Sequence, residues 1–173
     1  YMGFGCILIC FLSQGCGNLA ENEFGRLRVQ GQEIVNDQGP FLIKSIGTGN
    51  WMIQEGYMMQ STDAGIGTHT QFRTKLEQEM GEERTAEFYR DWLDNHMNKA
   101  DIDSMKAWGF NAIRPSLHYK WFTLTIQDEP VSGQNTWVNA GFEKLDELMN
   151  WASANQMYVM FDMHGAPGGQ GKN

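Results

Sequence analysis

The chain has 173 residues, with 13 lysine and arginine residues against 21 aspartate and glutamate residues, and therefore a formal net charge of −8. This acidic balance argues against a nucleic-acid-binding protein, because contacts with phosphates require clustered positive side chains. Hydrophobic residues make up 41% of the chain and charged residues 20%, which predicts a folded protein rather than a disordered one. The length fits one domain but is below the roughly 250 residues of a whole eight-stranded α/β barrel.

The beginning of the chain has the composition of an export signal. Residues 4–12 form an apolar run of the length found in signal peptides, well below the roughly 20 residues needed to cross a bilayer. The segment Leu12-Ser13-Gln14-Gly15-Cys16 resembles a bacterial lipoprotein cleavage site, in which Cys16 would receive the lipid. We therefore expect a signal peptide or a lipoprotein signal at 1–16, with a buried N-terminal strand as the alternative. Because the chain opens on Tyr1, we also expect residues upstream of it.

A polar linker at 17–23 and a folded domain at 24–173 are expected to follow this signal. The three cysteines all precede Glu21, so the domain can contain no disulfide and no zinc site built from cysteine. This organisation predicts a bacterial protein that is secreted, or held at the outer surface or in the periplasm by a lipid anchor.

The domain is predicted to open with a β-hairpin. Residues 27–30 and 33–36 are short strand-like runs on either side of Gly31-Gln32, and 36–40 is rich in turn-forming residues. The apolar run at 41–46 predicts the next strand, which leads into a glycine-rich loop at 47–51.

Residues 71–108 show the periodicity of two or three amphipathic helices, and Gly109 suits the end of the last one. A short strand is predicted at 110–114, another amphipathic helix at 142–152, and a strand at 157–163 that is apolar enough to be buried on both faces. Strands that alternate with helices in this way predict an α/β fold with a parallel sheet.

Functional residues of parallel α/β barrels lie at the carboxyl ends of the strands. In this chain those positions hold a small set of candidates: Asn50, Trp51, Glu55, Arg114, His118, Tyr119, Asp162, His164 and the loop 165–169.

Asp162 and His164 are two positions apart, so on a strand their side chains face the same way. Such a pair can hold a divalent metal or orient an imidazole, although a metal usually needs a third ligand. The alternative for Asp162 is that it only accepts backbone hydrogen bonds at the end of a strand. The Arg114 guanidinium keeps its charge and needs a carboxylate partner, for which Glu55 is one candidate.

Aromatic side chains near these positions are candidates for stacking on sugar rings, with packing in the core as the alternative for each. They are Trp51, Tyr119, Trp121 and Trp137.

Three segments in order, the run from the hairpin through the WMIQEGYM loop, DIDSMKAWGFNAIRP, and FDMHGAPGGQ, resemble the opening part of a family 5 glycoside hydrolase of the cellulase and exo-glucanase superfamily. The resemblance runs from about residue 27 to the end. It implies a partial (β/α)8 TIM barrel that contains the first three strands, an N-terminal β-hairpin and a truncated end.

The resemblance also implies site roles. Arg114 resembles the arginine that hydrogen-bonds the nucleophilic carboxylate, and His164 resembles the histidine that contacts sugar hydroxyls where cleavage occurs. Glu55 resembles an acidic residue that binds the same sugar. Trp51, Tyr119 and Trp121 are expected to contact substrate.

A retaining glycosidase acting on a β-glucan-type polysaccharide is the function that the resemblance implies. Its acid/base and nucleophile glutamates, about 5 Å apart, are expected after residue 173, so residues 1–173 alone are expected to be inactive. No cofactor, metal or nucleic-acid partner is expected, and the protein is expected to be a monomer. The alternatives are a carbohydrate-binding barrel without activity and a metallohydrolase that uses Asp162 and His164.

Overall fold

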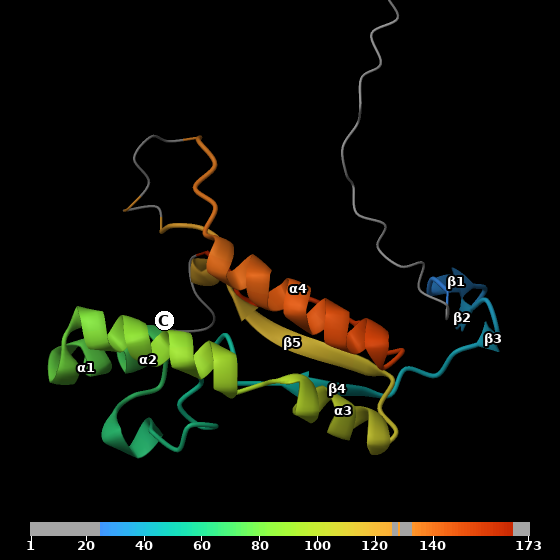
Figure 1. The fold of residues 1–173 in the computed structure, drawn as a ribbon, viewed down its shortest axis with the longest axis horizontal. Coiled ribbons are helices and arrows are strands. Elements are labelled where there is room, and N and C mark those ends of the chain that lie inside the picture. Colours follow the sequence, from blue (N-terminus) through green and yellow to red (C-terminus); the bar gives the residue numbers. More distant parts are fainter. Residues whose placement is uncertain (1–24, 126–127, 129–132, 168–173) are drawn as a thin grey trace, which may run out of the picture.

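A computed structural model of the chain describes residues 25–125, 128 and 133–167. Its two sheets are separate (Figure 1). The smaller one consists of β1 (Arg28–Gln30), β2 (Glu33–Asn36) and β3 (Gly39–Pro40), which are joined antiparallel. The predicted hairpin is therefore confirmed. Its tight turn contains Gly31 at a φ of 64°, a conformation that residues with a side chain rarely adopt.

The second sheet is parallel and carries the fold. Its central strand is β5 (Ala112–His118), which pairs on one side with β4 (Ser45–Thr48). On the other side β5 pairs with β6 (Tyr158–Val159) and then with β7 (Asp162–Gly165). Three successive parallel strands joined by helices confirm the predicted partial α/β barrel.

The strand predicted at 41–46 is only partly correct. The observed strand begins at Ser45, because the backbone before Ser45 is held by a side chain instead of a neighbouring strand. The amide of Asn111 donates to the Leu42 carbonyl at 2.8 Å, and its oxygen accepts from the Lys44 N–H at 2.7 Å.

The strand predicted at 157–163 is also only partly correct. It forms two short strands, β6 and β7, and Phe161 is 53% exposed where burial on both faces was expected. Both strands pair only with β5 among the described residues, so each has one open edge there.

The helical segments are α1 (His69–Met80), α2 (Glu82–Asn95), α3 (Lys99–Ala107) and α4 (Asn139–Ala154), with two 3₁₀ turns, η1 (Thr62–Ala64) and η2 (Tyr119–Trp121). Asn98 starts α3 with a reciprocal capping box to Asp101. Gly109 follows α3 with a φ of 90°, as its predicted place after a helix end requires. None of the helices in the described part of the chain is long and apolar enough to cross a membrane.

The core lies between the parallel sheet and the helices, with α4 running alongside β5 (Figure 1). Along α2 the buried residues Thr85, Tyr89 and Leu93 recur every four positions, which turns one face of that helix inward. The buried apolar side chains that fill this core are Trp51, Met52, Leu93, Met97, Ile102, Ile113, Leu117, Phe122, Leu148, Ala152 and Met157. This packing sets the carboxyl ends of β4, β5 and β7 side by side.

Candidate active site at the carboxyl ends of the parallel strands

Four side chains from three segments form a continuous polar cluster at this end of the sheet. Arg114 of β5 donates through Nη2 to Oδ2 of Asp162 at 2.6 Å. The same carboxylate oxygen lies 2.9 Å from Nδ1 of His164. On the far side of the imidazole, Oε1 of Glu55 lies 3.8 Å from His164 Nε2. Asp162 therefore bridges the guanidinium and the imidazole, and the Glu55 carboxylate faces the other side of the ring.

The shared face that was predicted for Asp162 and His164 explains this bridge. Both lie on β7, two positions apart, so one carboxylate reaches its neighbour on the strand and the arginine of the adjacent strand. Glu55, which was one candidate partner for Arg114, was wrong. The carboxylate that forms the ion pair with Arg114 is that of Asp162. Glu55 instead faces the imidazole of His164.

The loop that carries Glu55 is held by hydrogen bonds among its own residues, one of them from a side chain. Asn50 adopts a φ of 63°, a left-handed conformation that asparagine tolerates, and its Oδ1 accepts the Glu55 N–H at 3.1 Å. The N–H of Gly56 donates to the carbonyl of Gly67 at 3.0 Å. A Cβ at Gly56 would lie 2.4 Å from the Ile66 carbonyl oxygen, so only glycine allows this approach.

A pair of buried histidines lies beside this cluster. The ring of His69, the first residue of α1, lies 4.6 Å from the ring of His118 at the end of β5. Each ring accepts a backbone N–H at Nδ1 over 3.3 Å, His69 from Gln54 and His118 from Lys120. An imidazole that accepts at Nδ1 carries its proton on Nε2, so both rings are neutral.

Electrostatics favour the same neutral state. Burial, followed by the charge effects of His118, Lys120 and Arg73, lowers the pKa of His69 to about 3. Burial and the nearby ammonium of Lys120 lower the pKa of His118 to about 4. Neither histidine therefore supplies a cation to the site near neutral pH.

Tyr89 and Gln54 complete the buried layer behind the histidines. The Tyr89 hydroxyl donates to Gln54 Oε1 at 2.7 Å, and burial raises the pKa of Tyr89 well above its usual range. The side-chain nitrogen of Gln54 is buried without a hydrogen bond among the described residues.

Of the predicted aromatic contacts, the one at Trp51 was wrong. Trp51 is 1% exposed and its Nε1 donates to the Leu93 carbonyl at 3.0 Å, so the ring belongs to the core and offers no face to a ligand. Trp121 and Tyr119 are only partly buried; Trp121 donates to the Met52 carbonyl at 2.7 Å and Tyr119 stacks on His118 at 5.1 Å. Trp137 is 63% exposed and packs edge-on against Phe142.

Other predictions concern segments outside the described residues, namely the signal at 1–16 with Cys16, the linker at 17–23, and Gly168-Gly169 of the loop after β7. Within residues 25–125, 128 and 133–167, no group of three or more histidine, cysteine or acidic side chains is arranged to hold a metal ion. Asp162 and His164 instead hydrogen-bond to one another.

Residues 65–172 match the family model described as cellulase (glycosyl hydrolase family 5). The chain belongs to this family. A curated relative, named a probable glucan 1,3-beta-glucosidase A of Aspergillus niger, is 30% identical over 147 residues. That alignment covers 84% of this chain and 33% of the relative. A beta-xylosidase of Phanerodontia chrysosporium is 28% identical over 145 residues, which cover 83% of this chain and 28% of that protein.

The solved structures agree on the fold. The crystal structure of a rutinosidase from Aspergillus niger superposes with a TM-score of 0.54 at 18% identity, over 74% of this chain and 34% of that one. The family 5 chain thus spans about a third of the length of these relatives.

Sequence reasoning missed the pairing of His69 with His118. Both histidines look isolated along the chain because 48 residues separate them in sequence, and the one local sign is that His118 ends a largely buried strand. The spacing of Asp162 and His164 predicted that their side chains share a face, but the bond from Arg114 to Asp162 depends on the pairing of the strands.

Proposed function

We propose that the protein containing this chain is a glycoside hydrolase that cleaves the O-glycosidic bonds of a β-glucan-type polysaccharide. The observation that carries the proposal is the cluster of Arg114, Asp162, His164 and Glu55, in a family 5 chain, at the carboxyl ends of the strands. Barrel enzymes place their chemistry at this end of the sheet. The relatives that are named glucan 1,3-beta-glucosidases favour a β-glucan.

The proposed roles follow from the contacts. His164 would donate to or accept from sugar hydroxyls with its ring held by Asp162, while Glu55 would bind the same sugar across from it. Arg114 would support a catalytic carboxylate. Its side chain is 48% exposed, and only Nη2 bonds to Asp162, so other guanidinium donors remain for that carboxylate. Trp121 and Tyr119 would contact substrate as partly exposed aromatic rings.

The proposed mechanism retains the anomeric configuration. Two glutamates from residues beyond 173 would act, one as nucleophile and one as acid/base, about 5 Å apart through a covalent glycosyl-enzyme intermediate. Residues 1–173 alone would then be inactive. We also propose that the protein is exported, either free or lipid-anchored through Cys16, since a polysaccharide substrate lies outside the cell. We propose in addition that it is a monomer.

The test is hydrolysis by the complete gene product, with soluble β-1,3-glucan, β-1,4-glucan and xylan as substrates. NMR of the first product should show the β-anomer, and a chelator should leave the rate unchanged. His164→Ala should lower kcat/KM by at least about tenfold. His96→Ala is the matched control, because His96 is an exposed histidine that contacts the Gly49 carbonyl and lies outside the cluster.

Two results would contradict the proposal. Binding of these polymers without hydrolysis would indicate a carbohydrate-binding barrel, and activity that disappears with the chelator would indicate a metallohydrolase.

A further inference from the structure

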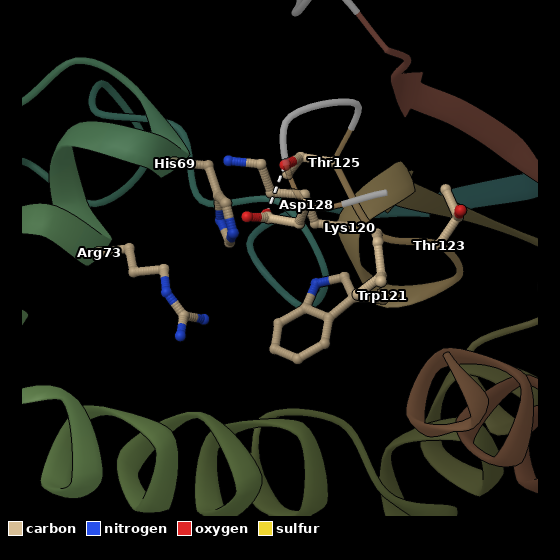
Figure 2. Close-up of a pocket in the computed structure, with 8 residues that line it drawn as sticks. His69, Arg73, Lys120, Trp121, Thr123, Thr125 and Asp128 are labelled. Atoms are coloured by element: carbon tan, nitrogen blue, oxygen red, sulfur yellow. Dashed lines mark hydrogen bonds between the residues drawn. The ribbon is translucent and has the colours of Figure 1, made fainter. Parts of the chain in front are cut away.

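A pocket of about 290 Å³ lies beside the histidine pair (Figure 2). Figure 2 shows His69 and Arg73, both from α1, on one side of this space, with Trp121 and Lys120 coming from the other side. The described residues that line it are His69, Arg73, Lys120, Trp121, Thr123, Leu124, Thr125 and Asp128.

The described lining of this pocket holds two cations, Arg73 and Lys120, and one carboxylate, Asp128. Oδ2 of Asp128 accepts from the Thr125 hydroxyl at 2.5 Å, and the hydroxyls of Thr123 and Thr136 bond to one another at 3.0 Å. Positive side chains therefore outnumber the single negative one among the described lining residues.

Several charged donors of the pocket are unused. Within the described part of the chain, the Lys120 ammonium forms no hydrogen bond or ion pair. Arg73 donates through Nε to Glu77 at 2.8 Å and its guanidinium lies 5.2 Å from the centre of the Tyr89 ring, while its terminal nitrogens donate to no described residue. Spare charged donors of this kind favour a ligand that carries an anionic acceptor.

His69 adds a neutral donor at the wall of the same pocket. The residue is 3% exposed, and its Nδ1 is occupied by the Gln54 N–H at 3.3 Å. Its proton is therefore on Nε2, which has no hydrogen-bond partner among the residues that the structure describes.

Trp121 supplies an apolar wall whose orientation is fixed. Its Nε1 donates to the Met52 carbonyl at 2.7 Å, and its ring packs edge-on against Tyr89 with centroids 5.8 Å apart. An indole held in this way can stack on the apolar face of a sugar ring at little entropic cost.

The pocket adjoins the proposed glycosidase site. His69 contacts His118 ring to ring, and a Cβ at Gly165 of β7 would lie 2.5 Å from His118 Cδ2. His164, the neighbour of Gly165, belongs to the cluster described above. The pocket and the cluster are therefore separated by the two histidine rings.

We propose that this pocket binds a carboxylate-bearing sugar, a uronic acid unit of the polysaccharide, through Lys120, Arg73 and His69, with its ring on Trp121. The proposal rests on the proposed glycosidase function, and it adds that the β-glucan-type substrate carries uronic acid units. The chain has a net charge of −8 and repels anions overall, so an anionic ligand needs local positive charge to bind. Lys120 and Arg73 supply that charge in the pocket.

The test is a titration of the complete, ¹⁵N-tryptophan-labelled gene product with methyl β-D-glucuronide, and separately with methyl β-D-glucoside, read from the indole N–H signals. The Trp121 signal, assigned with Trp121→Phe, should shift with the glucuronide at a dissociation constant about tenfold below that for the glucoside. Lys120→Met should weaken glucuronide binding about tenfold, and Lys120→Arg should keep it within about threefold. Lys75→Met is the matched control, since Lys75 is an exposed α1 lysine paired with Glu79.

Equal weakening by Lys120→Met and Lys75→Met would overturn the proposal, because overall charge would then explain the binding. Equal affinity for both sugars, or a Trp121 signal that does not move, would overturn it as well. Hydrolysis of neutral β-glucan by the same preparation tests the glycosidase function separately, so the two failures are distinguishable.

Discussion

Acidification should destabilise this protein through the two buried histidines. His69 and His118 have a usual pKa of 6.5 but fold with pKa values of about 3 and about 4. Between those values and 6.5 the unfolded chain binds a proton at each ring and the folded chain does not. Stability is therefore full above pH 6.5 and is lost as the pH falls toward 4 and 3.

The size of the effect follows from the same pKa values. At pH 5 an unfolded histidine is almost fully charged, while both folded rings are almost entirely neutral. Each histidine then lowers the free energy of unfolding by about 2 kcal/mol relative to pH 7.5, or ~4 kcal/mol for the pair. The structural reason is that a proton on Nδ1 would displace the backbone N–H of Gln54 or Lys120.

Urea unfolding of the complete gene product at pH 7.5, 6 and 5 measures this loss. The double variant His69→Asn, His118→Asn keeps an acceptor near each Nδ1 position but cannot titrate, so most of the pH dependence should vanish. His96→Asn, at an exposed histidine, should behave as the wild type. A double variant with the wild-type pH dependence would show that these rings are not the titrating groups.

Other perturbations test the core, the loop, the cluster and the domain. Trp51→Ala should lower the free energy of unfolding by about 3–5 kcal/mol in a urea titration, whereas a surface role would cost almost nothing. Gly56→Ala should destabilise by more than about 1 kcal/mol and Gly47→Ala by less, because a Cβ meets the Ile66 carbonyl only at Gly56; equal effects would contradict the close approach. Asp162→Asn should lower kcat about tenfold or more in the hydrolysis assay by releasing Arg114 and His164, and an unchanged kcat would remove the bridge from the mechanism. Residues 24–173 alone should lack a sharp thermal transition in calorimetry, because β6 and β7 have open edges in the described sheet; a cooperative transition would refute this.

Local features were predictable because they depend on neighbours in the sequence. The hairpin turn at Gly31 and the helix end at Gly109 both require a positive φ that glycine allows, and both lie where the sequence placed them. The spacing of Asp162 and His164 likewise predicted a shared face, which the bond between them confirms.

Predictions failed where a distant partner decides the outcome. The run at 41–46 has the composition of a strand, yet the Asn111 side chain holds its backbone from 67 positions away. Trp51 follows a glycine-rich loop whether its ring is open or buried, and only the Leu93 carbonyl, 42 residues further on, places it in the core.

The sequence by itself determined the family, the order of strands and helices, and the strand ends at which polar side chains gather. The tertiary structure decided which of those side chains meet: Asp162 with Arg114, Glu55 with His164, and His69 with His118. The physical reason is that strand pairing and helix packing bring together residues whose separation along the chain carries no signal of contact. Protonation follows from the same packing, because burial and neighbouring charges exist only in the folded chain.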